Sequence, residues 1–201
     1  MNRYVNKSKI KGLFVTALII CLMIAAITQY QAKAKYKSYI SSDIMQNLQS
    51  LNTILYENNN IYEAILGTGA LSSDQAYLLA YNNETISRII LENATRAVKL
   101  DYKEEDFAYS LSSLNAQKIA LFFSEINETI VDKELKGIIR QFSILNHEWL
   151  ETKELGIQNL GLDNSNWIKA IAGLEERTKE YLQKHNIENI EELWITRTEI
   201  K

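Results

Sequence analysis

Two histidines are the side chains of this sequence best suited to metal or acid–base chemistry. His147 lies between Asn146 and Glu148, and His185 follows a stretch of helical periodicity. A metal site needs several ligands that converge on one ion. No H-E-x-x-H, paired C-x-x-C or Glu-x-x-His pattern contains either histidine. Both are therefore predicted to be surface or interface residues, and we expect neither a metal nor a cofactor.

Adjacent acidic residues are the next candidates for chemistry. Neighbouring helix positions point about 100° apart, so an adjacent pair does not direct two carboxylates at one substrate. A solvated helix face is the favoured interpretation for Glu104–Glu105, Glu175–Glu176 and Glu191–Glu192. No serine lies in a G-x-S-x-G motif, and no glycine-rich phosphate loop occurs. We therefore predict no catalytic residue and a protein that is not an enzyme.

Charge is distributed unevenly along the 201 residues, whose net charge is −3. Residues 1–37 contain seven basic residues and no acidic one, whereas the remainder has 15 basic and 25 acidic residues, a balance of −10. Phosphate binding needs a clustered positive field, so nucleic acid is not expected as a partner of the acidic part. The single cysteine, Cys21, excludes an intramolecular disulfide.

An uncharged, mostly apolar run over residues 12–28 determines the expected compartment. A helix of this length rises about 26 Å, close to the roughly 30 Å of a bilayer core. More basic side chains precede the run than follow it, which predicts a cytoplasmic amino terminus. We expect a short basic cytoplasmic segment at 1–11, a transmembrane helix at 12–30 and an extracytoplasmic domain at 31–201. The residues predicted to span the bilayer are Gly12, Leu13, Phe14, Val15, Ala17, Leu18, Ile19, Ile20, Cys21, Leu22, Met23, Ile24, Ala25, Ala26 and Ile27.

A cleavable signal peptide is the alternative interpretation of the same run. Ala32, Lys33 and Ala34 form an A-x-A-like site, and cleavage near Ala34 would release a secreted helical protein. The distance of this site from the apolar run, and the lysine within it, favour a retained anchor.

The absence of proline and the presence of only seven glycines favour long helices over a sandwich or barrel. We predict an all-α fold in which the transmembrane helix continues without a hinge into an antiparallel bundle of four or five helices. The first helix is expected over about 8–57, with Asn58–Asn60 as its stop and a short helix to the glycines at 67 and 69. Further helices are predicted at 73–99, from the acidic run at 101–106 to about 126, at 133–159, at 167–185, and from a cap at Asn186 to the carboxyl terminus. The clearest loop is 161–166, a capping aspartate is expected at Asp132, and no strand is predicted.

Large aromatic residues are expected to dominate the core of the bundle, above all Trp149 and Trp167 with Phe122 and Phe123. Trp194 is the exception, because Leu193, Trp194 and Ile195 cannot all face one way on a short terminal helix. We therefore predict Trp194 and Leu193 as interface residues.

Three hypotheses of function follow from these features. The leading one is a membrane-anchored bundle with a non-catalytic role in binding or positioning a protein, either another protein or a second copy. The alternative is a ligand-sensing or regulatory module, since the architecture resembles, as a class, the helical sensor ectodomains of bacterial membrane receptors. An inner segment of about eleven residues would require a partner for any signalling. The third is an enzyme, which would need two or more of His147, His185 and the carboxylates to meet in one cleft.

Overall fold

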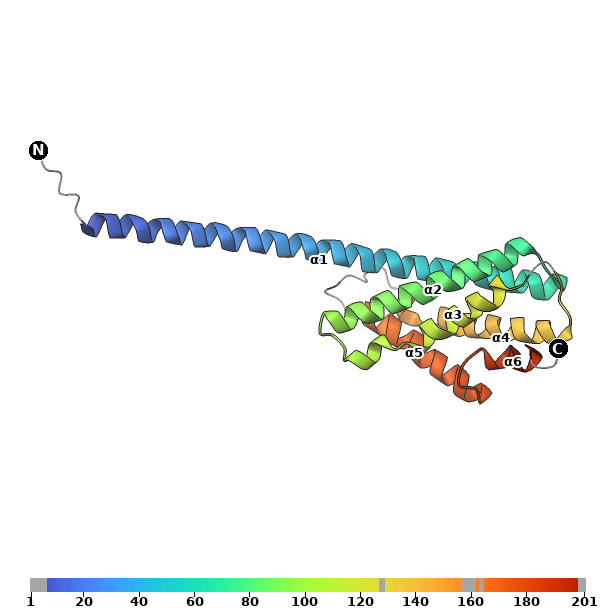
Figure 1. The fold of residues 1–201 in the computed structure, drawn as a ribbon. Helices are drawn as coiled ribbons and strands as arrows, with labels where there is room; N and C mark the ends of the chain where they lie inside the picture. Colours follow the sequence, from blue (N-terminus) through green and yellow to red (C-terminus); the bar gives the residue numbers. More distant parts are fainter. Residues whose placement is uncertain (1–6, 127–128, 157–161, 163–164, 199–201) are drawn as a thin grey trace, which may run out of the picture. The chain divides into compact units, whose positions relative to one another are not determined.

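The computed structural model describes residues 7–126, 129–156, 162 and 165–198. Within these ranges the chain is all-α, as predicted, and six α-helices follow one another (Figure 1). They are α1 (Lys7–Thr68), α2 (Ser73–Lys99), α3 (Leu111–Ser124), α4 (Lys133–Leu150), α5 (Asn166–His185) and α6 (Glu192–Thr198). Two 3₁₀ turns, η1 (Glu105–Ala108) and η2 (Lys153–Gly156), and two short strands, β1 (Ala70–Leu71) and β2 (Thr129–Ile130), lie between them.

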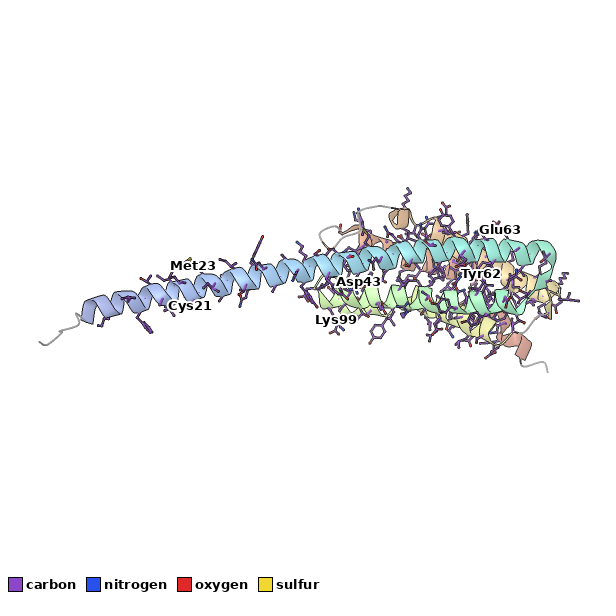
Figure 2. All side chains as sticks on the ribbon, turned by 90° about the horizontal axis from the view of Figure 1, so that it is seen from above. Cys21, Met23, Asp43, Tyr62, Glu63 and Lys99 are labelled. Carbon is purple, nitrogen blue, oxygen red and sulfur yellow. The ribbon has the colours of Figure 1, made fainter. Side chains whose placement is uncertain are left out.

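The chain divides into two compact units, Met1–Ser42 and Asp43–Lys201, and α1 contributes to both. In the first unit every side chain from residue 11 to residue 39 is exposed. Figure 2 labels Cys21 and Met23 on this part of α1. Among the described residues, α1 is the one helix long and apolar enough to cross a membrane, a criterion that a signal sequence near the amino terminus also meets.

The second unit is a bundle in which successive long helices run in opposite directions (Figure 1). Apolar side chains from α1 to α5 meet in its core, and burial of such side chains is the main favourable contribution to folding. Figure 2 shows Tyr62 on the side of α1 that faces α2 and Glu63 on the other side. The largest fully buried side chains of this core are Trp149, Trp167, Tyr62, Phe123 and Phe142. The predicted burial of Trp149, Trp167, Phe122 and Phe123 is therefore confirmed.

The predicted stop of the first helix at Asn58–Asn60 is wrong, because α1 continues to Thr68. Asn58 is fully buried and accepts a hydrogen bond from Asn82 of α2 through its side chain, at 2.9 Å. Asn59 donates to Glu63 one turn further along α1, at 2.9 Å. These side chains therefore bond within the helix or across the bundle, and α1 needs no cap at this point.

The turn after α1 was predicted correctly, whereas the absence of strands was not. Gly69 takes the left-handed conformation with φ +71°, which glycine adopts without steric cost. Directly after it, Ala70 and Leu71 pair antiparallel with Ile130 and Thr129. Two residues per strand show no alternation, so this pairing left no signal in the sequence.

The helix boundaries agree with prediction where a local cap determines them. Ser72 and Gln75 form the predicted capping box, and α2 has the predicted bounds 73–99. Asp132 caps α4 as expected, since its side chain accepts from the Leu135 N–H at 2.8 Å. The predicted loop at 161–166 lies partly outside the described residues, as does the start of the connection at 127–132.

Three predicted boundaries need correction. The acidic run at 104–106 lies in and beside η1, and α3 begins only at Leu111, after its cap Ser110. Helix α4 ends at Leu150 and not at 159, and residues 157–159 of the predicted helix lie outside the described residues. Asn186 ends α5 in the left-handed conformation, with φ 53°, so it is a carboxyl-terminal cap and not the amino-terminal cap of the last helix.

Candidate functional site

The two histidines lie on different helices. His147 is an exposed residue of α4, and its Nε2 lies 3.9 Å from Oε1 of Glu151, one turn away. His185 is the last residue of α5 and lies against Tyr181, with ring centroids 4.5 Å apart. No contact joins the two histidines within the described residues. Over those same ranges, no group of three or more His, Cys, Asp or Glu side chains is arranged to hold a metal ion.

Two of the acidic pairs predicted as solvated faces contain a carboxylate with a structural partner, so that interpretation was wrong for them. Glu175 on α5 accepts hydrogen bonds from Ser110, Leu111 and Ser112 at the start of α3. A carboxylate is favourable there because the amino-terminal N–H groups of a helix carry partial positive charge. Glu191 forms an ion pair with Lys118 of α3. Sequence spacing could not reveal either contact, because each joins residues more than sixty positions apart.

A groove between α2 and α3 is the candidate binding site of the bundle. Its volume is about 510 Å³. Helix α2 contributes about three turns of one face, from Ser73 to Glu84, and α3 together with Ile126 contributes the other wall. The lining residues are Ser73, Tyr77, Ala80, Tyr81, Glu84, Gln117, Ala120, Leu121, Phe123, Ser124 and Ile126.

Large apolar and aromatic side chains are exposed along this groove. Tyr77 is 70% exposed and Tyr81, one turn further along α2, is 56% exposed. Leu121 faces them from α3 at 57% exposure, and the base of the groove contains the buried Phe123 and Ala120. Contiguous exposed apolar surface on a bundle is typical of an interaction site, and tyrosine is enriched among the residues that dominate binding energy.

Among the lining residues that the structure describes, Glu84 is the only acidic or basic one. The nearest basic residue along α2, Arg88, pairs with Glu92 at 3.3 Å, and Lys118 on the facing helix pairs with Glu191. The Glu84 carboxylate has no hydrogen bond or ion pair with any residue that the structure describes, and it is exposed. In the part of the chain that the structure describes, the groove therefore combines an apolar, aromatic lining with one acidic residue, Glu84, that has no ionic partner.

The residues predicted to span a membrane all lie in α1, and their side chains are exposed. Trp194 and Leu193, predicted as interface residues, lie in α6 and are half-buried. The indole of Trp194 contacts Phe122 and Phe142, with ring centroids 5.0 and 5.6 Å apart. Part of Trp194 thus extends the aromatic core, and its role in an interface stays a prediction.

The sequence contains a weak signal for the groove that periodicity did not reveal. Tyr77 and Tyr81 are one turn apart and lie off the apolar stripe of α2, as Leu121 lies off the stripe of α3. Large apolar residues outside a core stripe, on two consecutive helices, are the pattern to look for. That the two faces adjoin depends on how α2 packs against α3, which the sequence alone does not give.

No protein-family model, no curated protein and no solved structure matches the chain. Its function is therefore inferred from the geometry of its own residues.

Proposed function

We propose that this protein is a membrane-anchored helical bundle that binds another protein through the groove between α2 and α3, without catalysing a reaction. The observation that carries the proposal is the exposed row of Tyr77, Tyr81 and Leu121 above a buried base. Side chains of this kind lose much apolar surface to water when a partner covers them.

The open rim of the groove favours a protein partner over a small molecule. A ligand-sensing site would enclose most of its ligand and present several converging polar groups. In this groove the two tyrosines and Leu121 are more than half exposed, so a small molecule would remain largely in water. An extended partner surface would cover all three side chains together.

The anchor is the apolar part of α1, with the bundle on the extracytoplasmic side. Support comes from the length and apolar character of this helix and from the basic flank of 1–11 before it. A second basic group at Lys33, Lys35 and Lys37 follows, with Tyr30, Tyr36 and Tyr39 between and beside the lysines. Aromatic and basic residues of this kind are favoured at the membrane–water interface.

Site-specific photocrosslinking in cells that express the full chain tests the binding function. A benzoylphenylalanine at position 77 or 81 is expected to give a discrete crosslinked product. Tyr109 is the matched control, because it is 86% exposed and does not line the groove. Equal yields at all three positions, or no product from positions 77 and 81, would contradict binding at the groove.

Cysteine accessibility tests the anchor and its orientation. In a Cys21→Ser background, Tyr109→Cys is expected to react with a membrane-impermeant maleimide in intact cells and to remain in the membrane fraction. Labelling only after permeabilisation would place the bundle inside. Recovery of labelled bundle in the medium, shortened near Ala34, would instead indicate a cleaved signal sequence.

A further inference from the structure

We infer that the partner of the α2–α3 groove is a basic amphipathic helix of another protein, whose apolar face covers Tyr77, Tyr81 and Leu121 and whose lysine or arginine meets Glu84. This inference rests on the proposed binding function and adds the chemistry of the partner. It follows from the shape of the groove, from the isolation of Glu84 and from the charge of the bundle.

The shape of the groove fits a helix. Two packed helices leave between them a furrow that a third helix can occupy by the same ridge-into-groove packing that builds a bundle. The α2 wall from Ser73 to Glu84 is about 17 Å long at the rise of an α-helix. A helical segment of three to four turns would therefore match it, with apolar residues at the i, i+3, i+4 and i+7 positions typical of helix-in-groove recognition.

Local electrostatics favour a basic residue at the Glu84 end. Arg88, one turn further along α2, and Lys118, the basic residue of α3, are paired with other carboxylates, so neither neutralises Glu84. If a partner buried this carboxylate without a counter-ion, the carboxylate would lose its hydration and gain no compensating interaction. A lysine or arginine at that point removes the penalty and fixes the register of the bound helix.

The net charge of the second unit, Asp43–Lys201, also favours a basic partner. Residues 43–201 contain 15 basic and 25 acidic residues, a net charge of −10, so the field around the bundle attracts cationic segments and repels anionic ones. The same charge disfavours a second copy of this bundle as the occupant. Two facing copies would bring two acidic surfaces and two Glu84 carboxylates together.

The test uses two synthetic helical peptides of about 15 residues, long enough to cover three to four turns. They share one leucine face and differ only in their polar face, which carries lysine and glutamine in one peptide and glutamate and glutamine in the other. Binding to the full chain in nanodiscs of zwitterionic lipid is measured by fluorescence anisotropy, with empty nanodiscs as the baseline. The lysine peptide is expected to bind about tenfold more tightly than the glutamate peptide.

Variants of Glu84 assign that preference to the groove. Glu84→Gln is expected to weaken the lysine peptide about threefold to fivefold, the size of an exposed ion pair. Glu84→Lys should shift the preference toward the glutamate peptide. Glu176→Gln is the matched control, because Glu176 is exposed on α5 outside the groove and its loss changes the net charge equally. All three variants change exposed residues, and circular dichroism checks that the bundle still folds.

The outcomes separate this inference from the proposed function. Equal affinity for the two peptides, no binding of either, or equal effects of Glu84→Gln and Glu176→Gln would overturn the basic-helix inference. Crosslinking at positions 77 and 81 would still support protein binding at the groove in each of these cases. A crosslinked product of twice the mass of the chain would identify a second copy as the occupant and would also overturn the inference.

Discussion

The carboxylate of Glu175 caps the amino terminus of α3 through Ser112. Its Oε2 accepts from the backbone N–H of Ser112 at 3.1 Å and from the Ser112 hydroxyl at 2.9 Å. Its other oxygen accepts from the Leu111 N–H at 3.1 Å. Glu175 also lies 3.7 Å from Lys179 and is largely buried. One side chain of α5 thus satisfies two of the free N–H groups at the start of α3 and fixes the two helices to each other.

Replacing Glu175 is expected to destabilise the bundle. Glu175→Ala removes a charged acceptor from two backbone donors and should lower the free energy of unfolding by about 2–3 kcal/mol. Glu175→Gln keeps one acceptor oxygen and should cost about half as much. Urea unfolding of the solubilised chain, followed by tryptophan fluorescence, measures the difference. The adjacent Glu176→Ala should change it by less than about 0.5 kcal/mol, and equal losses at both positions would refute the capping role.

Features set by a few neighbouring residues were predictable from the sequence. The capping box of Ser72 and Gln75 and the capping Asp132 gave the starts of α2 and α4, and Gly69 lies in the turn after α1. Each of these signals acts within about four residues, so no knowledge of packing is required. The all-α class followed from composition and from the helical periodicity of apolar residues, which also require no knowledge of packing.

Features that depend on distant partners were not predictable. Asn58 was expected to stop α1 because asparagine is common at helix ends, yet Asn82 of α2 gives its side chain a partner inside the bundle. Glu175 was expected to be solvated because it belongs to an adjacent acidic pair, and its partners on α3 lie more than sixty residues earlier in the sequence. The groove likewise exists only because α2 packs against α3, although its tyrosines are visible in the sequence.

The buried pair of Asn58 and Asn82 provides a second stability test. Asn58→Ala removes the buried acceptor of the Asn82 side-chain amide. It should lower the free energy of unfolding by about 1–3 kcal/mol. Asn82 also donates to Glu57 at 3.1 Å, so Glu57 is expected to retain part of that interaction. A double variant with leucine at both positions should recover part of the loss, because neither position then holds a buried polar group and the exposed Glu57 is solvated. The unfolding midpoints of Asn58→Leu, Asn82→Leu and the double variant measure this effect, with the exposed Asn60→Ala as the control. A loss in the double variant equal to the sum of the two single losses would contradict a shared interaction.

Trp149 should contribute more to stability than Trp194. Its side chain is fully buried, and its indole N–H donates to the Thr178 hydroxyl at 2.9 Å. Trp149→Phe removes this bond and leaves a cavity, so a loss of about 2–3 kcal/mol is expected. Trp194→Phe keeps an aromatic ring beside Phe122 and lies at a half-buried position, so it should cost less than about 1 kcal/mol. Thermal unfolding of the two variants ranks them, and the reverse order would show that α6 contributes more to the core than its burial indicates.

Two buried tyrosines should make the bundle less stable in alkaline solution. Burial raises the pKa of Tyr62 and of Tyr181 well above the ordinary tyrosine value of about 10. Tyr62 accepts from the Asn83 amide at 3.5 Å, which opposes part of the rise in its pKa. Tyr181 donates to Gln141 at 2.9 Å.

The sign of the pH effect follows from the raised pKa values of Tyr62 and Tyr181. Below about pH 9 both states keep the phenolic protons, so these tyrosines add no pH dependence. Above about pH 10 the unfolded chain loses protons that the folded bundle retains, and the free energy of unfolding falls by up to about 1.4 kcal/mol per pH unit for each tyrosine. Urea midpoints measured from about pH 8 to pH 11 should therefore decline, with a shallower slope in a Tyr62→Phe, Tyr181→Phe double variant. The exposed Tyr109→Phe should keep the original slope, and an unchanged slope in the double variant would show that other groups cause the alkaline loss.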